Sequence, residues 1–118
     1  MAFPATLDIQ YYRGDTYEFK LYPKDAAGAT FNLRDYTVTF TISTARGSTV
    51  AGTTSIGYSA IASDYTNIVC AIKPANGAWM TNGDSYVYDI QISKSGVDYP
   101  SVITLLTGNI SVTEQVTV

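Results

Sequence analysis

The sequence contains no histidine and one cysteine, Cys70, among its 118 residues. Without histidine the chain lacks the commonest general base, the usual partner of a nucleophilic serine or cysteine, and a frequent ligand of transition metals. A single cysteine excludes an internal disulfide. Because Cys70 lies in the apolar run NIVCAIK (67–73), we interpret it as a buried structural thiol.

Charged residues are also scarce, at 14% of the chain, with a net charge of −3 and a pI near 4.5. The seven Lys and Arg residues are scattered, whereas nucleic-acid binding needs them clustered, so we expect no nucleic-acid partner. In place of charge stand 16 Thr, 10 Ser and 10 Tyr. Such a surface costs little to desolvate, which suits a protein packed against a partner.

Long apolar runs are missing too, since none approaches the ~20 residues that a membrane-spanning helix needs. The first residues, MAFPATLD, show neither the basic nor the apolar region of a secretory signal. We therefore expect no membrane partner and synthesis in a cytoplasm.

The acidic residues offer no evident catalytic arrangement. Most of the ten Asp and Glu residues fall in predicted turns or on outward strand positions, where solvation is their usual role. TNGD (81–84) lacks the repeated oxygen ligands of a calcium loop, and no glycine-rich loop leads into a helix to cradle a phosphate. We expect no enzymatic activity, no catalytic residues, no cofactor and no metal site.

Alternation of apolar and polar residues with period two dominates the chain and predicts strands. It is clearest in YTVTFTIS (36–43), which places Val38, Phe40 and Ile42 on one face. Other predicted strands are TLDIQYY (6–12), TYEFKLY (16–22), NIVCAIK (67–73), SYVYDIQIS (85–93), YPSVITLLTG (99–108) and NISVTEQVTV (109–118), with a weaker one in GTTSIGYSAI (52–61). Their spacing predicts a single domain over 1–118, an all-β, Ig-like sandwich of seven or eight antiparallel strands in two sheets.

Turn residues separate these runs, among them TGN (107–109) and Arg13-Gly14-Asp15. The latter tripeptide is an integrin signal in secreted proteins, but here glycine and aspartate between two strands predict a turn. PANGAWM predicts at most one short helical turn near 74–80, because Pro74 can begin a helix and Gly83 can follow it.

Six residues are candidates for contact with a partner. An exposed Trp79-Met80 pair would be an anchor, but the same pair could close the open end of the sandwich. Residues 1–6 form a possible extended arm, in which Phe3 and Pro4 either fray or lie on a neighbour. Tyr12 and Tyr99 are not confined to an apolar face.

The strand in YTVTFTIST carries neither charge nor proline, the residues that commonly protect a free sheet edge. Either this strand is central, or another chain covers its edge.

The stretches RGDTYEFKL (13–21), FNLRDYTVTFTIST (31–44) and YVYDIQISKSGVDYPSVITLLTGNISVTEQVTV (86–118) carry a resemblance to a known family. They resemble the accessory β-sandwich domains of tailed-bacteriophage virion proteins. The resemblance implies a non-enzymatic virion component, most simply a capsid decoration protein, and it carries over no functional residues.

Three functional hypotheses follow. The first is a decoration protein on the capsid, bound to the major capsid protein as a homo-oligomer, for which a trimer at a symmetry axis is one arrangement. Its runner-up is a small tail, baseplate or fibre-associated virion protein. The third, from another class, is a carbohydrate-binding module, for which we expect a planar row of tyrosines with Trp79.

Overall fold

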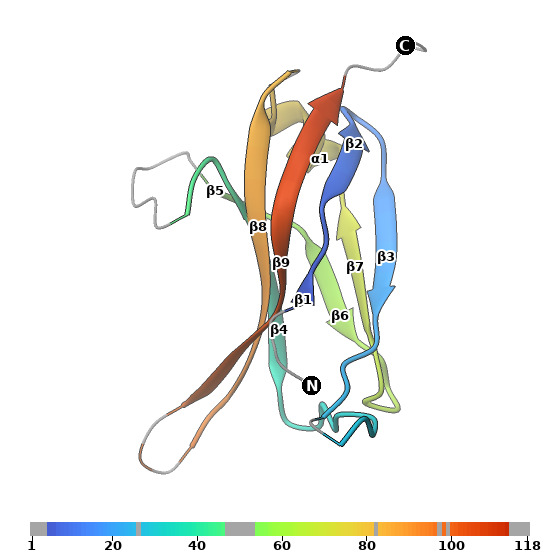
Figure 1. The fold of residues 1–118 in the computed structure, drawn as a ribbon, viewed down its shortest axis with the longest axis vertical. Helices are drawn as coiled ribbons and strands as arrows, with labels where there is room; N and C mark the ends of the chain where they lie inside the picture. The colour runs from blue at the N-terminus through green and yellow to red at the C-terminus, as the bar shows by residue number, and fades with distance from the viewer. Residues whose placement is uncertain are drawn as a thin grey trace.

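The computed structural model describes residues 5–25, 27–46, 54–81, 83–96, 98 and 100–113. These residues form nine strands and one short helix (Figure 1). The helix α1 (Pro74–Trp79) begins at a proline, as predicted. The strands are β1 (Ala5–Thr6), β2 (Ile9–Tyr12), β3 (Tyr17–Leu21), β4 (Thr37–Ser43), β5 (Thr54–Ile56), β6 (Tyr58–Ile61), β7 (Ile68–Ile72), β8 (Ser85–Lys94) and β9 (Ser101–Thr113).

The strands form two sheets that pack face to face, which confirms the predicted all-β sandwich. The larger sheet has the order β1-β9-β8-β4-β5, with β2 also paired to β9, and the smaller one has the order β3-β7-β6. In the letter scheme of Ig-like sandwiches, β9-β8-β4-β5 correspond to strands G-F-C-C′, and β3-β7-β6 correspond to strands B-E-D. The first strand is split into β1 and β2 and joins the larger sheet.

The pairing of the first and last strands differs from the prediction. β1 and β2 run parallel to β9, with Ile9 opposite Ile110, so the sandwich is not wholly antiparallel. The predicted strand over 6–12 is interrupted at Leu7 and Asp8, and the Leu7 side chain is 40% exposed. β1 and β2 keep one register along the same edge of β9, since Ala5 lies opposite Leu106 and Ile9 lies opposite Ile110.

The predicted turn at 107–109 is wrong, because β9 continues through Gly108 to Thr113. Glycine is used here for close approach: a Cβ at this position would collide with the Leu7 carbonyl. The ladder between β8 and β9 contains a β-bulge, because Ile90 faces Leu106 whereas the next residue, Gln91, faces Thr104. The bulge turns both Leu105 and Leu106 into the core, which breaks the simple alternation.

The weaker strand predicted over 52–61 is two strands in different sheets. β5 pairs with β4 in the larger sheet and β6 pairs with β7 in the smaller one, and the chain changes sheet at Gly57. The Gly57 N–H donates to Phe40 O at 2.9 Å, and Ser59 Oγ donates to Val38 O at 3.5 Å. β4 is therefore central, and where β5 ends its edge is covered by β6 of the same chain.

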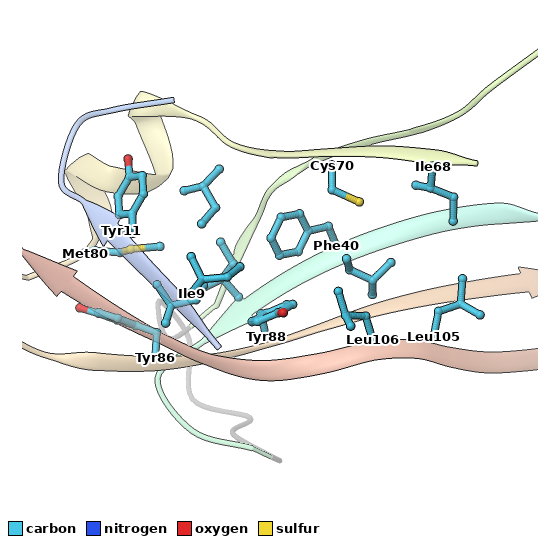
Figure 2. Close-up of a cluster of buried hydrophobic side chains, with 14 of the residues drawn as sticks. Ile9, Tyr11, Phe40, Ile68, Cys70, Met80, Tyr86, Tyr88, Leu105 and Leu106 are labelled. Atoms are coloured by element: carbon cyan, nitrogen blue, oxygen red, sulfur yellow. The ribbon is translucent and has the colours of Figure 1, made fainter. Parts of the chain in front are cut away.

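The space between the sheets is filled by one hydrophobic cluster to which both sheets and α1 contribute. Figure 2 shows Phe40 of β4 between Cys70 of β7 and Tyr88 of β8. The Phe40 ring makes edge contacts with Tyr88 at 5.6 Å and with Phe19 of the smaller sheet at 6.0 Å between centroids. This aromatic trio joins the two layers where a chain with two cysteines could place a disulfide.

The Arg13-Gly14-Asp15 segment is a turn, as predicted. Gly14 has φ of +91°, and the Asp15 N–H donates to Tyr12 O at 3.0 Å. The turn packs on α1, where Arg13 Nε donates to Met80 O at 2.8 Å. Its role in the fold is thus to connect the two sheets at the end of the sandwich that holds the helix.

Candidate interaction surface

The outer face of the larger sheet is a neutral, hydroxyl-rich surface. Alternation in β4 buries Phe40 and Ile42, so Thr37 and Thr39 point outward and are exposed. Across the sheet, Thr37 Oγ1 lies 3.1 Å from Ser93 Oγ, and Gln91 Nε2 donates to Thr104 Oγ1 at 3.3 Å. These side chains satisfy one another without net charge, so covering them removes no unpaired ion from water.

An ion pair between Arg46 and Asp89 lies on this face. Arg46 Nη1 donates to Asp89 Oδ1 at 2.8 Å, and Arg46 Nη2 donates to Gly108 O at 3.3 Å. The same Asp89 oxygen accepts a 2.7 Å hydrogen bond from Thr107 Oγ1. The two charged side chains are 50% and 37% exposed, so the pair adds at most about 1 kcal/mol to stability. Its main effect is to balance charge on the surface.

Two depressions flank this ion pair and share Arg46 and Asp89. The first, of about 280 Å³, lies toward β4 and β5 and reaches Thr41 and Thr54. The second, of about 610 Å³, lies toward β1 and β9 and reaches Asp8, whose Oδ1 accepts from the Asn109 N–H at 3.1 Å. We name the two together the Arg46–Asp89 groove. Its walls offer hydroxyl, carboxylate and guanidinium groups, which match polar backbone or sugar hydroxyls.

The outer face of the smaller sheet has a different chemistry. Register places Tyr58, Ala71 and Glu18 in one row across the three strands, and Ala60, Val69 and Lys20 in the next. Small apolar side chains thus lie between an exposed tyrosine on β6 and a charged edge on β3. The two broad faces of the sandwich are therefore not equivalent.

Titratable groups in the core are held in their neutral forms. Burial raises the pKa of the Cys70 thiol to about 12, so the thiol stays protonated and unreactive at neutral pH. Burial also raises the pKa of Tyr11 and of Tyr88. Their hydroxyls donate to Asp15 O at 2.6 Å and to Leu7 O at 2.5 Å, so both tyrosines serve the fold.

Within the described ranges, no group of three or more Cys, Asp or Glu residues is placed to hold a metal ion. The described residues also form no helix of the length and apolar character needed to cross a bilayer.

The structure describes three of the six predicted contact residues, Tyr12, Trp79 and Met80. Tyr12 ends β2 and is 55% exposed, as a contact residue must be. The exposed Trp79-Met80 anchor is wrong, because Met80 is 1% exposed and belongs to the core. Trp79 is half-buried, with its ring 5.2 Å from that of Tyr86, so the pair closes the end of the sandwich. The other three candidates, Phe3, Pro4 and Tyr99, lie outside the described residues.

The Arg46–Asp89 groove was not predicted from the sequence. Alternation in SYVYDIQIS indicates that Asp89 points outward, and this is the one signal available. Arg46 and Thr107 lie far from Asp89 in the sequence, and only the order β9-β8-β4 brings all three together.

Neither a protein-family model nor a curated protein matches this chain. A functional proposal therefore depends on the surface chemistry and on the resemblance carried by the sequence.

Proposed function

We propose that this chain is a non-enzymatic structural protein of a bacteriophage particle that binds the outside of the capsid as a decoration protein. The observation that carries the proposal is the outer face of the larger sheet, which is broad and carries few charges. The described side chains on it are mostly hydroxyls and amides around Arg46, Asp89 and Asp8.

Such a face suits attachment to a repetitive protein surface. Covering hydroxyl and amide groups that find new partners costs little, whereas covering unpaired charges costs several kcal/mol each. A capsid offers the same contact many times, so a modest affinity per copy is sufficient for high occupancy, and linkage between copies strengthens retention. The resemblance to phage accessory domains points to the same kind of partner.

A tail, baseplate or fibre-associated location is the alternative within the same class. Copy number distinguishes the two, since hundreds of copies per particle indicate the capsid and a handful indicate the tail. Quantitative mass spectrometry of purified particles measures it. Absence of the chain from the particles would contradict both locations.

The attachment face is tested by release and rebinding. Mild denaturant is expected to remove the chain from particles while the shell survives, and added wild-type chain is expected to rebind. Thr39→Lys places an unpaired charge on the neutral face and is expected to weaken rebinding at least about tenfold. The matched control is Tyr22→Lys, which adds the same charge at a 56% exposed position outside this face and is expected to rebind normally. Equal rebinding by both variants would exclude the proposed face.

Carbohydrate binding is a second candidate, favoured by the polar walls of the Arg46–Asp89 groove. The expected row of tyrosines with Trp79 does not support it, because Trp79 packs on Tyr86 instead. A glycan array with wild-type protein and with Arg46→Ala decides this point. Binding at micromolar affinity that Arg46→Ala abolishes would favour a carbohydrate-binding module over a decoration protein.

A further inference from the structure

The two halves of β9 have different neighbours. From Leu106 onward β9 lies between β8 and the first strands, with Ala5 opposite Leu106. Between Ser101 and Leu105, β8 is the one strand among the described residues that pairs with β9. We name residues 101–105 the β9 edge. Figure 1 shows that the ends of β8 and β9 nearest their connection project from the body of the sandwich.

The β9 edge lacks the residues that usually protect a free strand. It reads Ser-Val-Ile-Thr-Leu, without charge or proline, and Val102 is 57% exposed. In contrast, the edge strand β3 of the smaller sheet carries Glu18 and Lys20. Unpaired backbone groups on an uncharged edge are a template for another strand.

We propose that the β9 edge pairs with the β9 edge of a second copy of this chain, in antiparallel orientation about a two-fold axis at Ile103. Among the described residues, the limits of the β9 edge set this register, because Ala5 of β1 lies opposite Leu106 and the strand begins at Ser101. Val102 then lies opposite Thr104 of the second copy, and each Ile103 faces its counterpart.

A second copy is the occupant that the chemistry favours. A two-fold interface must be self-complementary, and antiparallel backbone satisfies that condition for any sequence. A two-fold axis perpendicular to the sheet keeps Val102 and Thr104 on the same face in both copies. Because β9 contains no charged residue from 101 to 113, self-pairing brings no like charges together. The three central opposed residues, Val102, Ile103 and Thr104, are β-branched, which cross-strand pairs favour.

This pairing would join two larger sheets edge to edge and make their outer faces continuous. Five residues per copy bury less area than a standard interface, so we expect a dissociation constant in the micromolar range. The inference does not rest on the proposed function, because the dimer is measured in purified protein without any particle.

Charge substitutions at Val102 and Thr104 test both the contact and its register. Val102→Lys with Thr104→Lys places lysine opposite lysine and is expected to weaken dimerisation at least about tenfold. Val102→Lys with Thr104→Glu places opposite charges together at the same two positions and is expected to dimerise as well as wild type or better. Both variants replace the same residues, so a general loss of folding cannot produce the difference. Sedimentation equilibrium measures the dissociation constants, and circular dichroism verifies folding.

Cysteine cross-linking provides an independent measure of the register. Opposed residues in an antiparallel pair have Cα atoms about 4.5–5.5 Å apart, within the range of a disulfide. Ile103→Cys is therefore expected to give a covalent dimer under mild oxidation, while Ser111→Cys, exposed further along β9, is expected to stay monomeric. The native Cys70 is buried and does not compete.

Three results would overturn the proposal. One is a wild-type protein that stays monomeric at about 100 μM. The second is equal dimerisation of the Lys/Lys and Lys/Glu variants. The third is amide-exchange protection that does not fall on dilution for those N–H groups of residues 101–105 that point away from β8, since that would assign the edge to residues 1–4 of the same chain.

Discussion

Gly108 and Tyr88 show how single residues hold the first strands of the chain onto β9. The absence of a side chain at Gly108 lets the Leu7 carbonyl approach β9, and the Tyr88 hydroxyl donates to that carbonyl. The Leu7 N–H donates in turn to Thr107 O at 3.0 Å. The close contact of the segment between β1 and β2 with β9 thus depends on one glycine and one buried hydroxyl.

Gly108→Ala is expected to destabilise the protein by about 3 kcal/mol, because the new methyl group must displace backbone rather than a flexible side chain. Urea unfolding measures the change. Gly28→Ala is the matched control: it has free space around it and only the strain of φ +85°, so we expect about 1 kcal/mol. Equal losses in the two variants would contradict the close approach at Gly108.

The buried Cys70 thiol is expected to lower the stability of the folded protein in alkaline solution. In the unfolded chain the thiol titrates near its ordinary pKa of 9.0, whereas burial in the folded protein raises the pKa to about 12. Between these values the unfolded state releases a proton that the folded state retains, so stability falls as pH rises above 9. The thiol alone is expected to lower the free energy of unfolding by about 1.4 kcal/mol between pH 8 and pH 10.

Cys70→Ala removes the thiol and leaves both buried tyrosines in place. Urea unfolding at pH 8 and pH 10 is expected to show a smaller pH dependence in the variant by that amount. Identical pH dependence would mean that the thiol is not desolvated.

At the scale of elements, α1 is joined to β5 by one buried side chain. Asn76 is 3% exposed, and its Oδ1 accepts from the Lys73 N–H at 2.9 Å, which caps the first turn of the helix. Its Nδ2 donates to Ser55 Oγ at 2.6 Å and to Ile56 O at 3.1 Å. A helix of six residues has little stability by itself, so this connection fixes its position.

Asn76→Ala is expected to cost about 3 kcal/mol, because three part-buried hydrogen bonds made by a buried side chain are lost. Asn32→Ala is the control, since Asn32 makes one exposed bond to the Arg34 N–H and is expected to cost about 0.5 kcal/mol. Thermal unfolding compares the two variants. A cost for Asn76→Ala as small as for Asn32→Ala would contradict the anchoring role.

How well each element could be predicted depended on whether its alternation was local. The runs around β4, β7 and β8 were predicted because their buried residues recur at every second position. The predicted turn at 107–109 was wrong because Gly108 allows the close approach of the Leu7 carbonyl, and Leu7 is distant in the sequence. The change of sheet at Gly57 has a similar cause, since a Cβ there would meet the Phe40 ring. Sequence patterns do not contain such contacts between distant segments.

The interaction surface could be predicted only in its general chemistry. The abundance of Thr and Ser predicted a neutral surface, and the outer face of the larger sheet has that character. The Arg46–Asp89 groove depends on strand order, and the burial of Met80 depends on how α1 packs under the Arg13 turn. Neither feature produces a periodic pattern of apolar and polar residues in the sequence.

At the scale of the whole molecule, side-chain packing fills the space between the two sheets. The trio of Phe19, Phe40 and Tyr88 crosses the space between them, and Phe40 is completely buried. With no disulfide between the layers, this contact and the surrounding aliphatic cluster supply the stability of the sandwich.

Phe40→Ala is expected to destabilise the fold by about 4 kcal/mol, because it empties the centre of the core and leaves two aromatic rings without their partner. Guanidinium chloride unfolding measures the loss. Tyr22→Ala, at a 56% exposed position, is expected to change stability by no more than about 0.5 kcal/mol. A small loss at Phe40 would mean that the layers do not depend on the trio.

The parallel pairing of β2 with β9 has a consequence for biosynthesis. Ile9 leaves the ribosome early but finds its neighbour, Ile110, only after the intervening strands have been made. Until then β2 has no ladder to join, and its apolar side chains have no finished layer to pack on. Assembly of the larger sheet must therefore wait for late translation, and such long-range closure is slow compared with local pairing.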